Sequence, residues 1–278
     1  MRPNERENIN ADDGLDDETL SQTQRHTADS NVILGSPPSK YRLRYRYLVQ
    51  TQTNLLNQER RRARDVSSLS DELNVPDLPR LLNHFLCEQL RNDDHEDPNH
   101  THDHACPRFM GCVVVVNRAI ATFHTPSDPS NVEGMRHEVI RATPSWRRGM
   151  PRYDCIFVSS NNEVDGMRGM EVARAICFFS FLYLGTTYPC ALVQWYSRIS
   201  EEPDDDTGMW MVSPDFDHSG NPILAVIHID CIFRAAHLIP MFGNSFIPDH
   251  ITYYNSLDNF KGFYVNRFVD HHAFDIAS

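Results

Sequence analysis

The sequence is poor in the features that mark secreted and membrane-spanning proteins. Residues 1–20 carry acidic side chains where a secretory signal peptide has an apolar core, and no apolar run approaches the roughly 18 residues of a membrane span. Basic residues are scarce as well: 26 Lys and Arg stand against 38 Asp and Glu, for a formal net charge of -12. Because this balance excludes non-specific nucleic-acid binding by the whole surface, only a locally basic segment could bind a polyanion.

Local motifs of common enzymes are also missing. GxSxG, the phosphate-binding P-loop, GxGxxG and HExxH do not occur. His228 and Asp230 in "IHID" would share one face of a strand, but no nucleophile stands beside them in the sequence. We therefore expect no catalytic residue, no cofactor and no small-molecule substrate.

The acidic stretch "EEPDDDTGMWMVSPDFDHSG", residues 201–220, is the best argument for metal chemistry. Its aspartates flank one short strand, and residues 206 and 215 would lie roughly 30 Å apart at about 3.3 Å per residue. Two-metal sites hold their ions about 4 Å apart. We expect these carboxylates to lie in solvated turns, and we predict no metal site among them.

Seven cysteines are present, an odd number. Cys155, Cys177, Cys190 and Cys231 lie in apolar strand-like runs, where a reduced cysteine behaves as a small hydrophobic side chain. This usage favours a reducing intracellular compartment, nuclear or cytoplasmic.

Composition divides the chain into four segments. Residues 1–39 are acidic, contain no aromatic residue and are expected to form a disordered tail. We predict a basic, partly helical arm over 40–74, and a helix with a His/Asp-rich linker over 75–105. The remainder, 106–278, is predicted to be a β-rich module with a C-terminal helix.

The basic arm, "KYRLRYRYLVQTQTNLLNQERRRAR", carries eight basic residues and one acid between residues 40 and 64, with tyrosines among the first arginines. It suits phosphate contact or nuclear import. Alternatively, it is a solvated helix whose arginines face water or pair with acidic segments. The candidate DNA-binding residues are Lys40, Arg42, Arg44, Arg46, Arg60, Arg61, Arg62 and Arg64.

The linker "RNDDHEDPNHTHDHACPRF" has alternating histidines. His100, His102, His104 and Cys106 offer imidazole and thiolate, which zinc prefers. No CxxC or second paired half follows, so a plain linker is the favoured interpretation, and metal binding stays open.

Two helices are expected. "VPDLPRLLNHFLCEQLRND" has Asp77 as its N-cap, Pro79 in its first turn and an apolar stripe that must pack against a core. "NSLDNFKGFYVNRFVDHHAFDIAS" is predicted to be helical from Ser256, with Phe260, Phe263 and Phe268 on one aromatic face.

Between these helices the pattern indicates strands. Residues 169–199 predict a long hairpin turning at "LGTT", where Gly185 can supply a positive φ, with Pro189 at an edge or bulge. "GMWMVSP" and "NPILAVIHID" are expected to pair with each other across "DFDHSG". Short strands at this spacing favour a small barrel or sandwich, and we expect an α+β chain with a small β-rich barrel flanked by helices.

Large aromatic residues on these strands allow a second kind of function. Trp195, Tyr196 or Trp210 could cage a methylated lysine, as in chromatin-type readers. Burial in the barrel core is the more common fate of such side chains and is the favoured interpretation. A metal-dependent hydrolase using aspartates and histidines is the least favoured alternative.

Eight segments occur in order between about Val75 and Ile276: "DLPRLLNHFL", "ACPRF", "IRATPSWRR", "PRYDCIFV", "GMEVARAICFFSFLYLGTTYPCALVQWYS", "DDDTGMWMVSPDFD", "VIHIDCIFRAAHLIPMFG" and "SLDNFKGFYVNRFVDHHAFDIA". Together they resemble the carboxy-terminal region of basidiomycete fungal transposase-like proteins of the Plavaka group, which are related to CACTA (En/Spm) elements. The resemblance covers over two thirds of the chain.

This resemblance implies a limited role. In such elements the DDE-type catalytic core, with an RNase H-like fold, lies upstream of this region, and nothing in this chain matches it. The chain therefore looks like a non-catalytic accessory or interaction module, somewhat similar to bromo-adjacent-homology domains. Its expected partners are a protein, such as another transposase segment or chromatin, and DNA through the basic arm.

Overall fold

The computed structural model describes residues 52–58, 62–93, 107–125, 135–160, 164, 166–243 and 246–278. The predicted acidic tail, the histidine-rich linker, and Lys40, Arg42, Arg44, Arg46, Arg60 and Arg61 of the arm lie outside the described residues. The helices are α2 (Val66–Leu73), α3 (Leu78–Asp93), α4 (Ser256–Asn259) and α5 (His271–Ile276), with short 3-10 turns η4 (Gly166–Gly169) and η5 (Ile229–Cys231).

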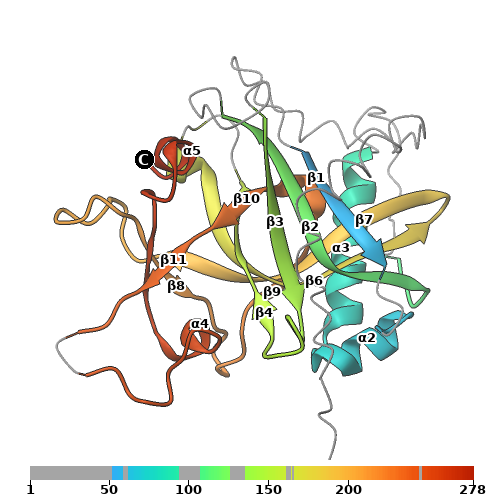
Figure 1. The fold of residues 1–278 in the computed structure, drawn as a ribbon. Helices are drawn as coiled ribbons and strands as arrows, with labels where there is room; N and C mark the ends of the chain where they lie inside the picture. Colours follow the sequence, from blue (N-terminus) through green and yellow to red (C-terminus); the bar gives the residue numbers. More distant parts are fainter. Residues whose placement is uncertain are drawn as a thin grey trace, which may run out of the picture. The chain divides into compact units, whose positions relative to one another are not determined.

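The strands are β1 (Gln52–Gln58), β2 (Val113–His124), β3 (Met135–Thr143), β4 (Arg152–Tyr153), β5 (Cys155–Ser159), β6 (Met170–Tyr183), β7 (Thr186–Arg198), β8 (Met211–Pro214), β9 (Leu224–His228), β10 (Ile232–Ala236), β11 (Leu238–Pro240) and β12 (Phe263–Val265). They join in the order β11-β12-β8-β7-β6-β2-β3-β4, with β1 on β2, β5 on β6, β9 on β7 and β10 on β5 (Figure 1). The result is a strand-rich antiparallel half-barrel, which confirms the β-rich prediction in its coarse form.

The β6–β7 hairpin is the centre of this sheet, and it forms where the sequence predicts it. Leu184 and Gly185 make the turn with φ of 48° and 83°, and Tyr183 pairs with Thr186. Pro189 lies one residue before Cys190, where the pairing of β7 with β9 begins. Because Pro189 is beyond the end of β9, its missing N–H costs no hydrogen bond there, as the predicted edge position requires.

Strand β6 is buried on both faces, which explains its nearly continuous apolar sequence. Ala173, Ala175 and Phe178 face the barrel interior, while Cys177 and Phe179 face the helices. The change from odd to even residues on the interior face follows from a register shift between Ala175 and Cys177. This β-bulge keeps apolar side chains on the interior side from Ala173 to Phe178.

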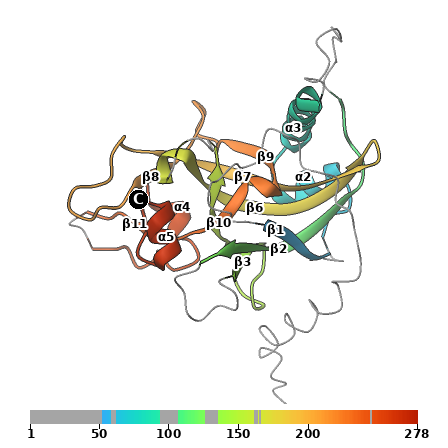
Figure 2. The ribbon, with the colours of Figure 1, turned by 90° about the horizontal axis from the view of Figure 1, so that it is seen from above.

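Helix α3 forms as predicted and packs its apolar stripe against the sheet. Leu82, Phe85 and Leu86 are fully buried in one cluster with Phe179 and Leu192 of the hairpin. Figure 2 shows α3 on the opposite side of β6 and β7 from β2 and β3. Among the described helices, none is both long and apolar enough to cross a membrane.

The predicted pairing of β8 with β9 is wrong. Both strands bind the same edge of β7: β9 pairs with Cys190–Gln194 and β8 with Tyr196–Arg198. Of the expected hairpin only an isolated bridge between Phe216 and Pro222 remains. The long β7 edge offers more hydrogen bonds than the two short strands can offer each other.

The predicted C-terminal helix is also wrong. The segment forms the short α4, the strand β12 and the short α5, and β12 pairs with both β8 and β11. Gly262 lies where a Cβ would be 3.2 Å from the Met241 sulfur. Phe263 and Val265 are fully buried on one face, so the two-residue alternation of a strand prevails over the helical spacing of the aromatic residues.

A buried arginine connects the C-terminal segment to the barrel. The Arg234 side chain on β10 is 0% exposed and donates to both oxygens of Asp270, the N-cap of α5, at 2.8 Å. It also donates to Glu138 of β3 at 3.3 and 3.4 Å. Burial alone would raise the pKa of Asp270, but the hydrogen bonds from Arg234 and the Ala273 N–H hold it well below its usual range.

His272 belongs to the same cluster and gives the fold a testable pH dependence. Its ring stacks between Phe123 and Phe233, with centroids 4.7 and 5.5 Å away, and Arg234 lies 3.3 Å from its Nδ1. Burial and the Arg234 charge lower the pKa of His272 to about 4. Since the unfolded chain takes up a proton near pH 6.5, this histidine costs stability as the pH falls from about 6.5 toward 4.

We predict that His272→Phe, which keeps the ring stacking but cannot titrate, flattens this dependence. The free energy of unfolding, measured by urea denaturation between pH 4 and 7, should fall less steeply on acidification in the variant. The exposed neighbour His271→Phe is the control and should retain the wild-type slope. Equal slopes in all three proteins would show that His272 is not buried in its neutral form.

Candidate functional site

Two of the eight candidate DNA-binding residues lie in the described chain, and they differ. The Arg62 side chain is 8% exposed, forms an ion pair with Glu72 of α2 and donates to the Asn117 side chain of β2. Arg64 is exposed, and its carbonyl accepts from the Val113 N–H at 2.9 Å. The arm therefore reaches the sheet beside Asn117, with Arg62 turned inward and Arg64 turned outward.

Three of the clustered aspartates accept hydrogen bonds that fix the local backbone. Asp204 accepts from the N–H and hydroxyl of Thr207, and Asp217 accepts from the N–H groups of Ser219 and Asn221. Asp215 accepts from the Ser197 hydroxyl at 2.8 Å. Within the described residues, no three His, Cys, Asp or Glu side chains are grouped closely enough to hold a metal ion.

The remaining titratable candidates are mostly buried. His228 Nδ1 lies 3.5 Å from Asp230, and burial lowers the pKa of His228 against the opposing effect of that carboxylate. Cys155, Cys177 and Cys190 are buried free thiols, and Cys231 is a half-buried one. Burial raises the pKa of Cys155, Cys177 and Cys231 to about 12, so these thiols are not activated nucleophiles.

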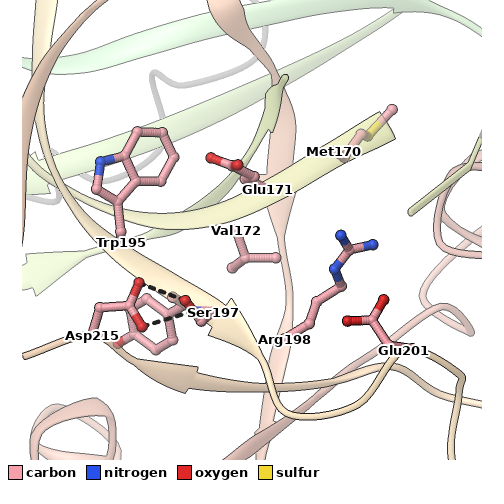
Figure 3. Close-up of a pocket in the computed structure, with 9 residues that line it drawn as sticks. Met170, Glu171, Val172, Trp195, Ser197, Arg198, Glu201 and Asp215 are labelled. Carbon is pink, nitrogen blue, oxygen red and sulfur yellow. Dashed lines mark hydrogen bonds between the residues drawn. The ribbon is translucent and has the colours of Figure 1, made fainter. Parts of the chain in front are cut away.

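Of the three aromatic residues considered for a cage, Trp195 and Tyr196 line one pocket, and only Trp195 is more than marginally exposed. Trp210 and Tyr196 belong to a buried core cluster and are 2% and 3% exposed. Trp195 is half-buried and lines a pocket of about 360 Å³ at the end of β6 and β7 (Figure 3). No three aromatic rings converge there, because Tyr196 points into the core.

The lining of the Trp195 pocket is mainly acidic. Glu171 of β6, Asp215 and Glu201 contribute carboxylates, and Arg198 is the one guanidinium among the lining residues (Figure 3). Asp215 is fixed by its hydrogen bonds to Ser197, and the Arg198 guanidinium lies 5.6 Å from the Trp210 ring centre. An aromatic face with excess negative charge suits an organic cation.

A second aromatic site, which the sequence reasoning above misses, occurs at the β3–β4 turn. The guanidinium carbons of Arg147, Arg152 and Arg141 lie 4.6, 4.8 and 5.8 Å from the centre of the Trp146 ring. The signal was local: "RATPSWRRGMPR" places four arginines around one tryptophan. We call Trp146 and these three arginines, with Arg148, the Trp146 cluster.

The Trp146 cluster has more positive charge than its neighbours neutralise. Arg152 pairs with Asp154 at 2.7 Å. Arg147 and Arg148 are exposed and, among the described residues, form no ion pair. Arg141 lies directly opposite Arg118 in the β2–β3 register, an arrangement of like charges that an isolated sheet disfavours.

Comparisons with protein-family models, with curated proteins and with solved structures gave no match for this chain. The candidate sites therefore rest on their own chemistry.

The different surroundings of Arg62 and Arg64 predict different effects on stability. Arg62→Ala should lower the free energy of unfolding by about 1–3 kcal/mol, because Glu72 and Asn117 lose their buried donor. Arg64→Ala should change it by no more than about 0.5 kcal/mol. Urea denaturation checks both; an Arg62→Ala protein as stable as wild type contradicts the inward placement of Arg62.

Proposed function

We propose that this chain is a non-catalytic accessory module that contacts nucleic acid through a local basic surface. The proposal keeps the resemblance to Plavaka-type, CACTA-related transposase-like proteins, with a barrel of the SH3 or bromo-adjacent-homology kind acting beside a catalytic core in the element's own protein. The observation that carries it is the Trp146 cluster, in which exposed arginines surround an aromatic ring.

Two further features support this surface. Because residues directly opposite in a sheet share a face, Arg118 extends the same basic face as Arg141. The arm reaches β2 at Asn117, the residue before Arg118. Phosphate groups would pair with the exposed Arg147 and Arg148, and a tryptophan can stack on a base. A chain with net charge -12 must confine such contact to one region.

The test is binding of labelled DNA, followed by fluorescence anisotropy over a range of salt concentrations. We predict that Arg147→Glu with Arg148→Glu weakens binding by at least about tenfold at low salt. The plot of log affinity against log salt should become shallower by about two, one for each lost phosphate contact. Replacing Arg60, Arg61 and Arg64 by Ala should also weaken binding; Arg62 is kept because it supports the fold.

The matched control carries Arg80→Glu and Arg168→Glu, two exposed arginines in surface ion pairs on α3 and η4. It changes the net charge equally and should keep most of the affinity. Equal losses of affinity in the control and in the Arg147/Arg148 variant would mean that DNA binding depends on net charge alone and not on the Trp146 cluster. Wild-type protein that binds no DNA at low salt would eliminate the proposed function.

A second candidate function is recognition of a cationic side chain in the Trp195 pocket. Three carboxylates and one aromatic face favour an ammonium group, and a methylated lysine is the ligand that the alternative interpretation of the sequence names. Trp195→Ala should weaken binding of a trimethyllysine peptide about twofold to thirtyfold by calorimetry, while Trp146→Ala should not. Equal affinity of the methylated and unmodified peptides would exclude this role.

A further inference from the structure

A separate pocket lies next to the Trp146 cluster. It has a volume of about 300 Å³ and is lined by the β3–β4 turn, by β6 and by the segment that leads into α4. Trp146, Tyr153, Tyr253 and Tyr254 contribute four aromatic side chains to it. We call this cavity the tyrosine pocket.

One of these aromatic residues, Tyr253, is not packed into the core. Tyr253 is 84% exposed, and its ring stands perpendicular to that of Tyr254 with centroids 5.4 Å apart. Tyr153 is half-buried deeper in the pocket, with the Arg174 guanidinium 5.4 Å from its ring centre. Exposed aromatic faces beside a cavity are costly to hydrate and suit a planar apolar ligand.

The cations that line the pocket already have partners. Arg174 is 7% exposed and forms an ion pair with Asp258, and Arg152 forms one with Asp154. The interior is therefore not an open anion site, and a ligand ammonium would meet the two guanidinium groups. Arg174 Nε, however, is buried without a hydrogen-bond partner. That nitrogen has almost no accessible surface, so a ligand cannot reach it; the paired guanidinium groups are what favour a neutral ligand over an ion.

Two exposed cations that form no ion pair among the described residues follow Trp146, which lines the pocket. Arg147 and Arg148 follow Trp146, and both have left-handed backbone conformations, with φ of 52° and 60°. Such conformations cost roughly 1 kcal/mol or more for each non-glycine residue, and they persist where the surrounding structure requires them. Here the Arg147 guanidinium lies 4.6 Å from the ring centre of Trp146, a residue that lines the pocket, and Arg148 is exposed beside it in the sequence.

A planar neutral group inside and negative charge outside describe one nucleotide in a strand. We propose that the tyrosine pocket receives a single unstacked base of a single-stranded nucleic acid, while Arg147 and Arg148 contact the adjoining phosphates. The inference rests on the proposed function and adds that the strand must be unpaired. A duplex keeps its bases stacked inside the helix and could reach only the arginines.

The experiment compares a short oligothymidylate with a strand of equal length built from abasic residues, both labelled for fluorescence anisotropy. Full-length wild type should bind the oligothymidylate more tightly. Tyr253→Ala should weaken oligothymidylate binding about fivefold to a hundredfold and leave binding of the abasic strand unchanged. Phe216→Ala, another exposed aromatic residue on the β8–β9 turn, is the control and should match wild type.

The outcomes separate this inference from the proposed function. Equal binding of the two strands by wild type, or equal weakening of both by Tyr253→Ala, would leave phosphate contact standing and overturn the base pocket. Binding of neither strand would overturn both proposals. Since Tyr253 is exposed and outside the core, loss of folding does not confuse the result; circular dichroism of the variant checks this.

Discussion

The half-barrel depends on one buried charge, the guanidinium of Arg234. It joins β10 to β3 through Glu138 and to the start of α5 through Asp270, and it lies 4.5 Å from the centre of the Phe123 ring. Such clusters are often no more stabilising than apolar packing, but losing one partner leaves an uncompensated buried charge. Arg234 therefore specifies a single position for the C-terminal segment more than it strengthens the core. That segment in turn supplies Tyr253 and Tyr254 to the tyrosine pocket.

Much of the fold was predictable because its signals are local. The β6–β7 hairpin follows from apolar strands meeting at Gly185, and α3 follows from its cap and its stripe of leucines. The predictions failed where a segment distant in the sequence determines the secondary structure or the pairing of a strand. Nothing in "GMWMVSP" indicates that this strand will pair with β7 and not with β9. The spacing of Phe260, Phe263 and Phe268 fits a helix, but Phe263–Val265 pairs with β8 and β11 as a strand.

The candidate site was predictable only in part. The prediction that the aspartates lie in turns follows from their proline- and glycine-rich neighbours, and the structure gives Asp204 and Asp217 partners within their own turns. Asp215 differs, because its partner is Ser197 of β7, 18 residues away. The inward orientation of Arg62 was not predictable, because Asn117 is 55 residues away. The tyrosine pocket likewise requires Trp146 and Tyr253, which are far apart in the sequence, to line the same cavity, and no local pattern reveals this.

The shared edge of β7 has a consequence for how such a chain can change over time. One strand, β7, sets the register of β6, β8 and β9 together. Inserting or deleting a single residue within Thr186–Arg198 would therefore move the side chains beyond that point to the opposite face of the sheet. Length variation should therefore collect in the connections, such as the turn at Leu184 and Gly185 or the loop between β8 and β9. Related sequences would differ in length there first, while β7 keeps its length.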